Sequence, residues 1–509
     1  MQRSARKGRA RVASASGQAL VPAMIFLLVG CIGLYVAFNS FQMTSAKIKL
    51  QNTADAAAYS AAVLQARDYN FAAYTNRAMV ANQVTAAQLV ALKSWIDELD
   101  STYSPTQVDE LVNEGLADHP DKWNTPRNAG KADTAPERAA LDALLPTVEK
   151  GIGSINRALS NAQVNYHAAV FATVPNTANV IAQQNQPDTQ VTQGYFTSSR
   201  NAAQLAAWRS YAGTVTPAGS TGSDDFADVV TDTTTLDGFV KNRDSSRSVA
   251  PDFQQLNDTL VGICGAGGTI TINVTHDGGT QLRNDKAGWE SIDASTGHVQ
   301  ISCMGPLEVA SGSGGSANGN VGSFMANPPF AAWQDWAGYG GYINFGYQGS
   351  STPGWQVPDS MAAQFGAGPG PSLDAANGGL LPYNEVSGAP FASTAPRITI
   401  EVTRNTNTLV KTIGLHGGGT MEIENNGANG AMRALSSARA YFVRPDETSL
   451  GSFAGGLVHA NEWARADHKT EYPSLFSPYW QATLAPVSDS ERKAAQTSLM
   501  SAAPQASKQ

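Results

Sequence analysis

Residues 19–41 read ALVPAMIFLLVGCIGLYVAFNSF, a stretch of 23 positions without a charged side chain. About 20 residues at a rise of 1.5 Å cross a hydrocarbon core of ~30 Å, so this stretch is long enough to span a membrane as one helix. Five basic residues stand in the first eleven positions: Arg3, Arg6, Lys7, Arg9 and Arg11. No acidic residue precedes Asp55, and this charge asymmetry predicts a cytoplasmic N-terminus and an exported remainder.

Two other interpretations of residues 19–41 compete with a membrane anchor. A buried helix of a soluble domain would leave the basic cluster before it unexplained. A cleaved signal peptide usually has a shorter apolar region, and here a helix-forming sequence follows without a break. We therefore predict a retained single-pass anchor.

The overall composition sets further limits on the class of protein. The 509 residues allow two to four domains, and 42% apolar residues are enough for a sizeable core. The formal net charge of −8 argues against a general nucleic-acid binder, which would carry a basic surface. Three cysteines exclude a disulfide-dense scaffold and a four-thiolate metal site.

A long helix is expected directly after the membrane segment. Neither Gly nor Pro occurs from residue 34 to residue 104, and alanine, the strongest helix former, is abundant there. Apolar residues recur three and four positions apart, as on one face of a helix. Five small residues on this helix would let another helix approach closely: Ala54, Ala57, Ala58, Ala61 and Ala62. This face belongs either to a helical hairpin in the protein's own core or to a stalk that packs against neighbouring subunits.

Two short motifs flank the apolar segment. The hexapeptide SGQALV at residues 16–21 enters it, and LQNTADAAA at residues 50–58 follows it. This order resembles the N-terminus of the TadE/TadG-like proteins of the bacterial tight-adherence (Flp) pilus assembly system. The sequence FSPYWQA at residues 476–482 is similar to a C-terminal motif of some long TadG-like members.

The resemblance implies a membrane-anchored pilus-assembly or minor-pilin-like component without enzymatic activity. The anchor would lie in the inner membrane, with the C-terminal region periplasmic or extracellular. The partners it implies are other pilus-assembly subunits, bound through the helix after the membrane segment, and not nucleic acid. It implies no cofactor.

One position departs from the pattern of pilin-like members. In those members a Gly precedes the cleavage point and a Glu stands five residues after it. Gly17 supplies the Gly, but the Glu position holds Pro22. We therefore predict that residues 1–17 are retained, as in an uncleaved assembly factor.

The chain as a whole is expected to have an α+β fold, helical first and β-rich later. Prolines make residues 105–135 a predicted loop, with kinks expected at Pro146 and residues 151–153 in the helical stretch that follows. Alternating apolar and polar residues predict strands at residues 269–275, 298–303 and 398–402. The division we expect is a basic cytoplasmic segment (1–18), a transmembrane helix (19–41), a helical region (42–211), a Thr/Ser/Asp/Gly-rich linker (212–250), a β-rich exported domain (251–445) with an insert at 305–390, and a C-terminal segment (446–509).

The insert at 305–390 is rich in Gly and Pro and contains an aromatic series at a spacing of three. The series is Phe330, Trp333, Trp336, Tyr339, Tyr342 and Phe345. These side chains either fold onto the core of the exported domain or form an interaction surface for partner subunits or glycans, because aromatic residues are enriched in interfaces.

Cys264 and Cys303 lie in or beside two of the predicted strands. In an exported domain they are expected to form a disulfide, and the alternative is two free buried thiols. Cys31 stands in the membrane segment and cannot pair with them.

No motif in the sequence supports catalysis, cofactor binding or a metal site. The glycines after His416 are similar to a lipase oxyanion loop, but the required Gly-x-Ser-x-Gly is missing. His459 and Glu462 do not form a His-Glu-x-x-His motif. The alternative to a pilus component is an exported, membrane-anchored hydrolase or glycan-binding protein whose site lies in the insert.

Overall fold

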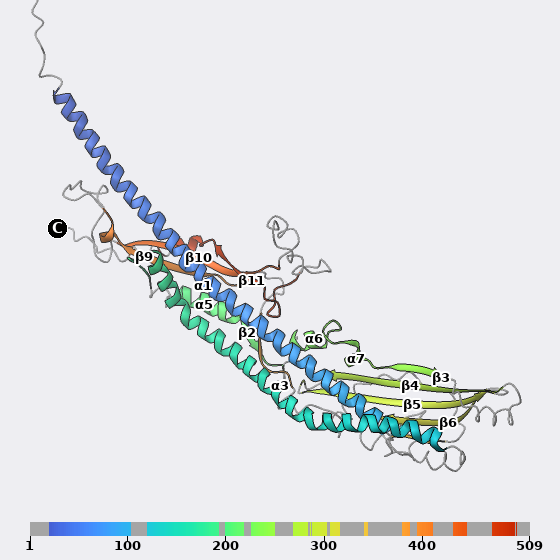
Figure 1. Ribbon diagram of the computed structural model, residues 1–509. Helices are drawn as coiled ribbons and strands as arrows, with labels where there is room; N and C mark the ends of the chain where they lie inside the picture. The colour runs from blue at the N-terminus through green and yellow to red at the C-terminus, as the bar shows by residue number, and fades with distance from the viewer. Residues whose placement is uncertain are drawn as a thin grey trace, which may run out of the picture.

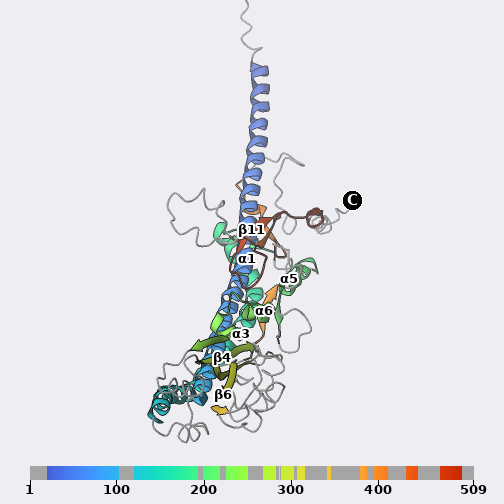
Figure 2. The same ribbon diagram turned by 90° about the vertical axis from the view of Figure 1, so that its right-hand side faces the viewer.

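The computed structural model has an elongated body built along one very long helix (Figure 1). It describes residues 20–102, 120–192, 199–217, 225–249, 268–282, 286, 288–302, 306–315, 341–344, 379–386, 394–410, 431–444, 471–493 and 495. Helix α1 (Leu20–Thr102) has 83 residues, or about 125 Å at 1.5 Å per residue. Its N-terminal part projects from the body, and the rest runs to the opposite end (Figure 2).

A second long helix, α3 (Pro120–Asn185), packs along α1 in the antiparallel direction. The predicted loop at 105–135 is wrong in its second half, because α3 begins at Pro120. Proline is compatible with the first turn of a helix, where its missing N–H has no partner to lose. The helix also continues through Pro146, although it bends along its length (Figure 1). The shorter α5 (Ser199–Tyr211) follows.

Three antiparallel sheets attach to this helix pair, as the expected α+β class requires. The sheet nearest the projecting end has the order β1-β9-β10-β11: Thr189–Val191, Ile398–Asn405, Ala431–Phe442 and Trp480–Ala485. A two-stranded sheet pairs β2 (Ala212–Val215) with β8 (Tyr383–Val386). The distal sheet has the order β3-β4-β5-β6-β7: Ser245–Val249, Thr269–Leu282, Trp289–Ser302, Pro306–Gly315 and Gly341–Asn344. A short 3₁₀ turn, η2 (Thr406–Thr408), follows β9.

The strands expected at 269–275, 298–303 and 398–402 correspond to parts of β4, β5 and β9. The stretch 212–250, which its composition suggested as a linker, differs from that expectation. It contains β2, α6 (Asp225–Thr231), α7 (Gly238–Lys241) and β3. Phe226, Val230, Leu236 and Val240 of this stretch are buried, whereas Phe239 is 40% exposed. These buried side chains fold the stretch onto the body despite their polar neighbours.

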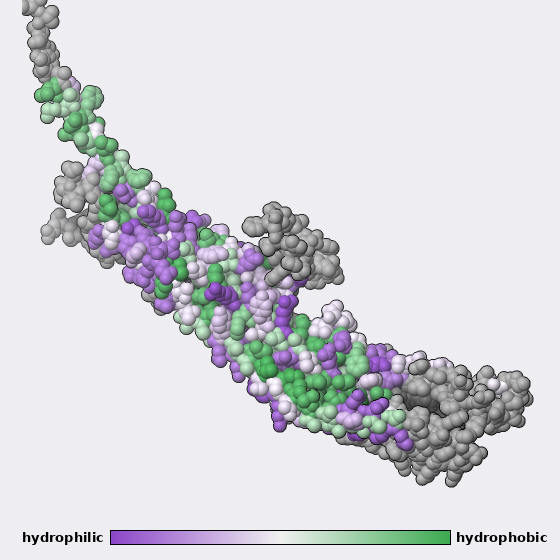
Figure 3. All heavy atoms as spheres, viewed as in Figure 1, coloured by the Kyte–Doolittle hydropathy of each residue, from purple (hydrophilic) through white to green (hydrophobic). Residues whose placement is uncertain are grey.

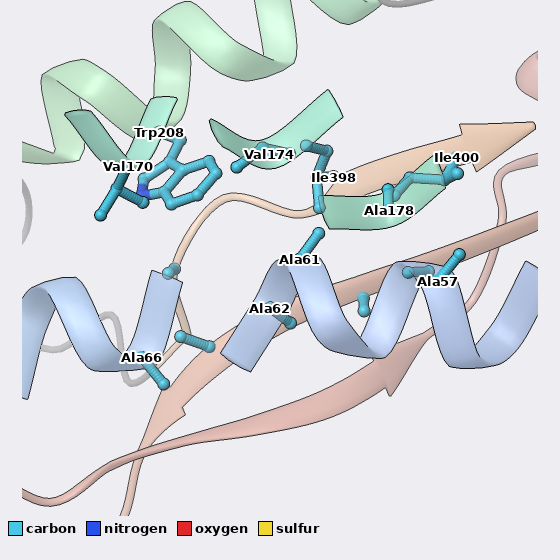
Figure 4. Close-up of a cluster of buried hydrophobic side chains, with 14 of the residues drawn as sticks. Ala57, Ala61, Ala62, Ala66, Val170, Val174, Ala178, Trp208, Ile398 and Ile400 are labelled. Carbon is cyan, nitrogen blue, oxygen red and sulfur yellow. The ribbon is translucent and has the colours of Figure 1, made fainter. Parts of the chain in front are cut away.

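Two clusters of buried apolar side chains follow α1. The cluster nearer the projecting end combines the alanine face of α1 with α3, the first sheet and α5 (Figure 4). The distal cluster gathers apolar side chains of α1, α6, β5 and β8, including Met79, Val90, Phe226, Trp289 and Tyr383. The long helix α1 therefore contributes buried side chains to both cores.

Candidate membrane anchor and stalk

The first turns of α1 form a bare apolar rod. Every residue from 20 to 34 is exposed, and the most apolar stretch of 18 residues has a mean hydropathy of 2.4 with no buried residue. Figure 3 shows this part as hydrophobic side chains extending beyond the body. Burial begins at Tyr35 and Val36, and Asn39 is buried. An apolar surface of this size in a soluble monomer would be unusual, so the segment is a candidate membrane span.

The alanine face of α1 is covered by the chain itself. Ala57, Ala58 and Ala61 are fully buried. Figure 4 shows this face opposite Val174 of α3 and Ile398 of β9. Small side chains allow this close contact with both a helix and a sheet. Of the two interpretations of this face, the structure agrees with the internal core.

Side-chain amides of α1 bind the backbone of the first sheet. Gln65 donates from Nε2 to the carbonyl of Pro396 (3.0 Å) and accepts from the N–H of Ala440 (2.7 Å). Asn70 donates to the carbonyl of Trp480 (2.9 Å) and accepts from its N–H (3.0 Å). The Asn70 amide thus makes the pair of backbone hydrogen bonds to β11 that a neighbouring strand would make. The Gln65 amide links β10 to Pro396, which lies just before β9.

A third amide, Asn76, joins three segments that are far apart in the sequence. Its Nδ2 donates to the carbonyls of Asn384 (3.0 Å) and Leu475 (2.8 Å), and its Oδ1 accepts from Gln163 Nε2 (2.6 Å). Asn76 is completely buried. Unpaired buried carbonyls are costly, so this side chain holds β8, residue 475 and α3 together.

Another side-chain amide, further along α1, also binds groups that are distant in the sequence. Gln83 accepts from the indole N–H of Trp289 at 2.9 Å and donates to the carbonyl of Gly379 at 3.2 Å. Sequence reasoning missed these amides because Asn and Gln on a helix usually face solvent. The signal was present: Gln65, Asn76 and Gln83 continue the three-and-four spacing of the buried alanines.

Hydrogen bonds and ion pairs of acidic side chains add to the contact between α1 and α3. Asp68 lies 2.6 Å from Nδ1 of His167, and both are buried. Burial raises the pKa of Asp68, and the hydrogen bond with His167 opposes this effect. Further along, Asp100 accepts from Arg138 (2.8 Å) and pairs with Lys131 (2.7 Å). The helix pair is thus held at separate points along its length, by a hydrogen bond at Asp68 and by ion pairs at Asp100.

The carboxylate of Glu491 ties the C-terminal segment to the first sheet. Its oxygens accept from Thr399 Oγ1 (2.8 Å), Gln204 Nε2 (2.5 Å) and Arg397 Nη2 (3.0 Å). Ser488 and Glu491 also exchange the reciprocal bonds of a capping box, in which the Ser488 N–H donates to Glu491 (2.9 Å). Burial alone would raise the pKa of Glu491, but these donors outweigh it and the pKa is lowered. An open hollow of about 390 Å³ lies beside this carboxylate.

The interaction and disulfide residues expected from the sequence are mostly outside the described part of the chain. This applies to Cys264, Cys303 and five members of the aromatic series: Phe330, Trp333, Trp336, Tyr339 and Phe345. The backbone of Tyr342 lies on β7, opposite Ser313 of β6. Among the described residues, no group of three or more His, Cys, Asp or Glu side chains could hold a metal ion.

Comparison with known families gives one match. Residues 17–66 match the family model Tad, described as putative Flp pilus-assembly TadE/G-like. Neither a curated protein nor a solved structure matches the chain. The matched segment, about a tenth of the chain, includes the bare apolar rod and the first part of the alanine face. It contains nearly all of the two motifs on which the resemblance was based, so the chain carries an N-terminal TadE/TadG-like Flp pilus-assembly domain.

Proposed function

We propose that this protein is a non-enzymatic, membrane-anchored component of a bacterial tight-adherence (Flp) pilus system, as an assembly factor or a minor-pilin-like subunit. The observation that carries the proposal is the unbroken α1. The N-terminal part of this helix is an exposed apolar segment inside the matched residues, and the rest of the helix packs into both cores. Such a helix holds the whole body at a fixed position above the membrane.

The outward face of α1 is the proposed contact with other pilus subunits. Tyr59 and Tyr74 are 46% and 59% exposed on this face, and Arg67 and Arg77 are exposed between and beside them. Tyr and Arg are enriched in protein interfaces. The face continues from the membrane segment, so a neighbouring membrane-anchored helix could follow it without crossing the body.

The proposed location is the bacterial inner membrane, with a cytoplasmic N-terminus and the body on the exported side. The division into a basic segment, an anchor, a helical region and a β-rich exported region is part of this proposal. A reporter fused after Gln509 is expected to be active only on the exported side, and cytoplasmic activity would contradict the topology. Mass spectrometry of the membrane-extracted protein is expected to find residues 1–17 retained.

Pilus formation tests the function directly. Deleting the gene in its own bacterium should strongly reduce surface pili seen by electron microscopy, and the full chain should restore them. In the complemented strain, Tyr74→Ala should reduce pili because it removes an exposed ring from the α1 face. Tyr472→Ala is the control, since Tyr472 is similarly exposed (53%) but is not a residue of α1. Normal pili in the deletion strain would refute the proposal and favour the exported hydrolase or glycan-binding alternative.

A further inference from the structure

Strand β11 is the outer strand of the first sheet. It pairs with β10 along one edge, and no strand among the described residues pairs with its other edge. The carbonyl of Tyr479, just before β11, accepts from the N–H of Val443 (3.2 Å). Successive residues of an antiparallel strand direct their N–H and C=O groups to opposite edges. The backbone groups of Trp480, Ala482 and Leu484 therefore point away from β10.

Side-chain amides cover the outward backbone groups of other edge strands. In β8, the N–H of Asn384 donates to Gln163 Oε1 (2.9 Å), and its carbonyl accepts from Asn76 Nδ2 (3.0 Å). At β1, the N–H of Val191 donates to Asn179 Oδ1 (3.0 Å). The two long helices thus supply hydrogen-bond partners that a further strand would otherwise supply.

The outer edge of β11 is covered only at its first residue. Asn70 binds both outward groups of Trp480. Within the described part of the chain, the N–H groups of Ala482 and Leu484 have no partner. Of their two carbonyls, only that of Leu484 accepts a hydrogen bond, from the adjacent Thr483 hydroxyl (3.3 Å). We call residues 482 and 484 the open edge.

The side chains beside the open edge differ between the two faces of the sheet. Leu484 lies opposite the buried Ala438 on the core face, yet it is itself 48% exposed. On the other face, Arg439 of β10 lies opposite Thr483. Among the described residues, no hydrogen bond reaches the buried Nε of Arg439 and no carboxylate pairs with its guanidinium. An apolar side chain would suit the first face and an acidic one the second.

We propose that an extended segment of another protein chain adds to the open edge as a fifth strand of the first sheet. Its backbone pairs with the free groups of Ala482 and Leu484, the mode in which peptides extend exposed sheet edges. Its side chains alternate between the two faces, so that apolar residues cover Leu484 and acidic residues face Arg439. An acidic residue opposite Thr483 stands two strand spacings, about 9.6 Å, from Arg439, a gap that the two long side chains together span.

A second copy of this chain fits the open edge less well than a different chain. Helix α1 runs along the sheet, since Gln51 binds the Leu435 carbonyl and Gln65 the Ala440 N–H. Antiparallel pairing of two β11 strands needs a two-fold axis perpendicular to the sheet, which would point the two α1 helices in opposite directions. Their apolar N-terminal segments could not then enter one membrane. This choice of partner rests on the proposed anchor, whereas the open edge does not.

Binding of a synthetic peptide to the full chain in detergent tests the proposal. The probe is a fluorescein-labelled peptide of about seven residues in which Val and Glu alternate, so that each residue type lies on one face of a strand. The control probe has Lys in place of Glu. Fluorescence polarisation should show saturable binding of the Val/Glu probe with a Kd below about 1 mM, and about tenfold weaker binding of the Val/Lys probe, whose cations face Arg439. In hydrogen exchange resolved by residue, the bound Val/Glu probe should protect the amides of Ala482 and Leu484.

Three variants separate the contributions of the backbone and the side chains. Leu484→Pro removes one outward N–H and no hydrogen bond to β10, and proline is tolerated at such edge positions. It should weaken the Val/Glu probe about tenfold. Leu484→Ala is the matched control, because it shortens the side chain but keeps the N–H, and it should bind more tightly than Leu484→Pro. Arg439→Gln should abolish the preference for the Val/Glu probe over the Val/Lys probe.

Three results would overturn the proposal. The first is no saturable binding of the Val/Glu probe up to about 1 mM. The second is equal binding by the parent and Leu484→Pro, with unchanged exchange of β9 and β10 showing that the variant folds; if it does not fold, a preference retained in Arg439→Gln decides instead. The third is a dimer in analytical ultracentrifugation that Leu484→Pro abolishes, because the edge would then belong to a second copy. None of these measurements involves pili, so their failure leaves the proposed function standing.

Discussion

The substitution Asn76→Ala tests whether α1 holds the body together through its buried amides. It leaves the helix backbone intact and removes both hydrogen bonds that Nδ2 donates, to the carbonyls of Asn384 and Leu475. Gln163 loses one acceptor but keeps the carbonyl of Ala72 at 3.1 Å. The change therefore isolates the two carbonyls, which belong to segments more than 300 residues from Asn76 (separations of 308 and 399).

The expected loss of stability follows from those two carbonyls. Each buried polar group that loses its partner costs about 1–3 kcal/mol. Alanine returns roughly 0.6 kcal/mol through its better helix propensity, which leaves a net loss of about 3 kcal/mol as a central value. At about 2–4 °C per kcal/mol for a domain of ~200 residues, the unfolding midpoint should fall by ~6–12 °C.

Thermal unfolding of the full chain in detergent, followed by near-UV circular dichroism, measures this shift. The matched control is Asn52→Ala, because Asn52 lies on the same helix and is exposed. It gains the same helix propensity, and an exposed site should change stability by less than about 0.5 kcal/mol. Equal midpoints for the two variants would refute the reasoning, since they would mean that the amide of Asn76 contributes no more than a solvated one.

Three further predictions concern other parts of the chain. Gly278→Ala should loosen the distal sheet in hydrogen exchange because a Cβ has no room there, whereas Gly213→Ala should not, since no atom lies within 4 Å of its Cβ. Cys264 and Cys303 are expected to form a disulfide; alkylation of Cys264 in the unreduced parent protein would contradict it. Glu491, with its lowered pKa, should hold the C-terminal segment above its ordinary value of 4.5 and release it as the pH falls through the lower folded-state value, which hydrogen exchange can follow.

The sequence alone was enough to predict the exposed apolar segment, the long helix and parts of the strands β4, β5 and β9, but not β6, β10 or β11. Each predicted feature depends on local properties. Residues 19–41 lack charge, residues 34–104 lack Gly and Pro, and residues 398–402 alternate between apolar and polar side chains. The family resemblance was also local, because all but the first residue of the two motifs lies within the segment 17–66 that the family model matches.

Other features depended on which segments meet, and this the local pattern does not contain. The spacing of Ala57 and Ala61 predicts a buried face, but it is equally compatible with a partner subunit and with the chain's own α3 and β9. Similarly, Asn76 reads as a surface residue until two distant carbonyls are placed against it. Periodicity marks the side of a helix that leaves water, whereas the identity of what covers it depends on long-range packing, which only the tertiary structure decides.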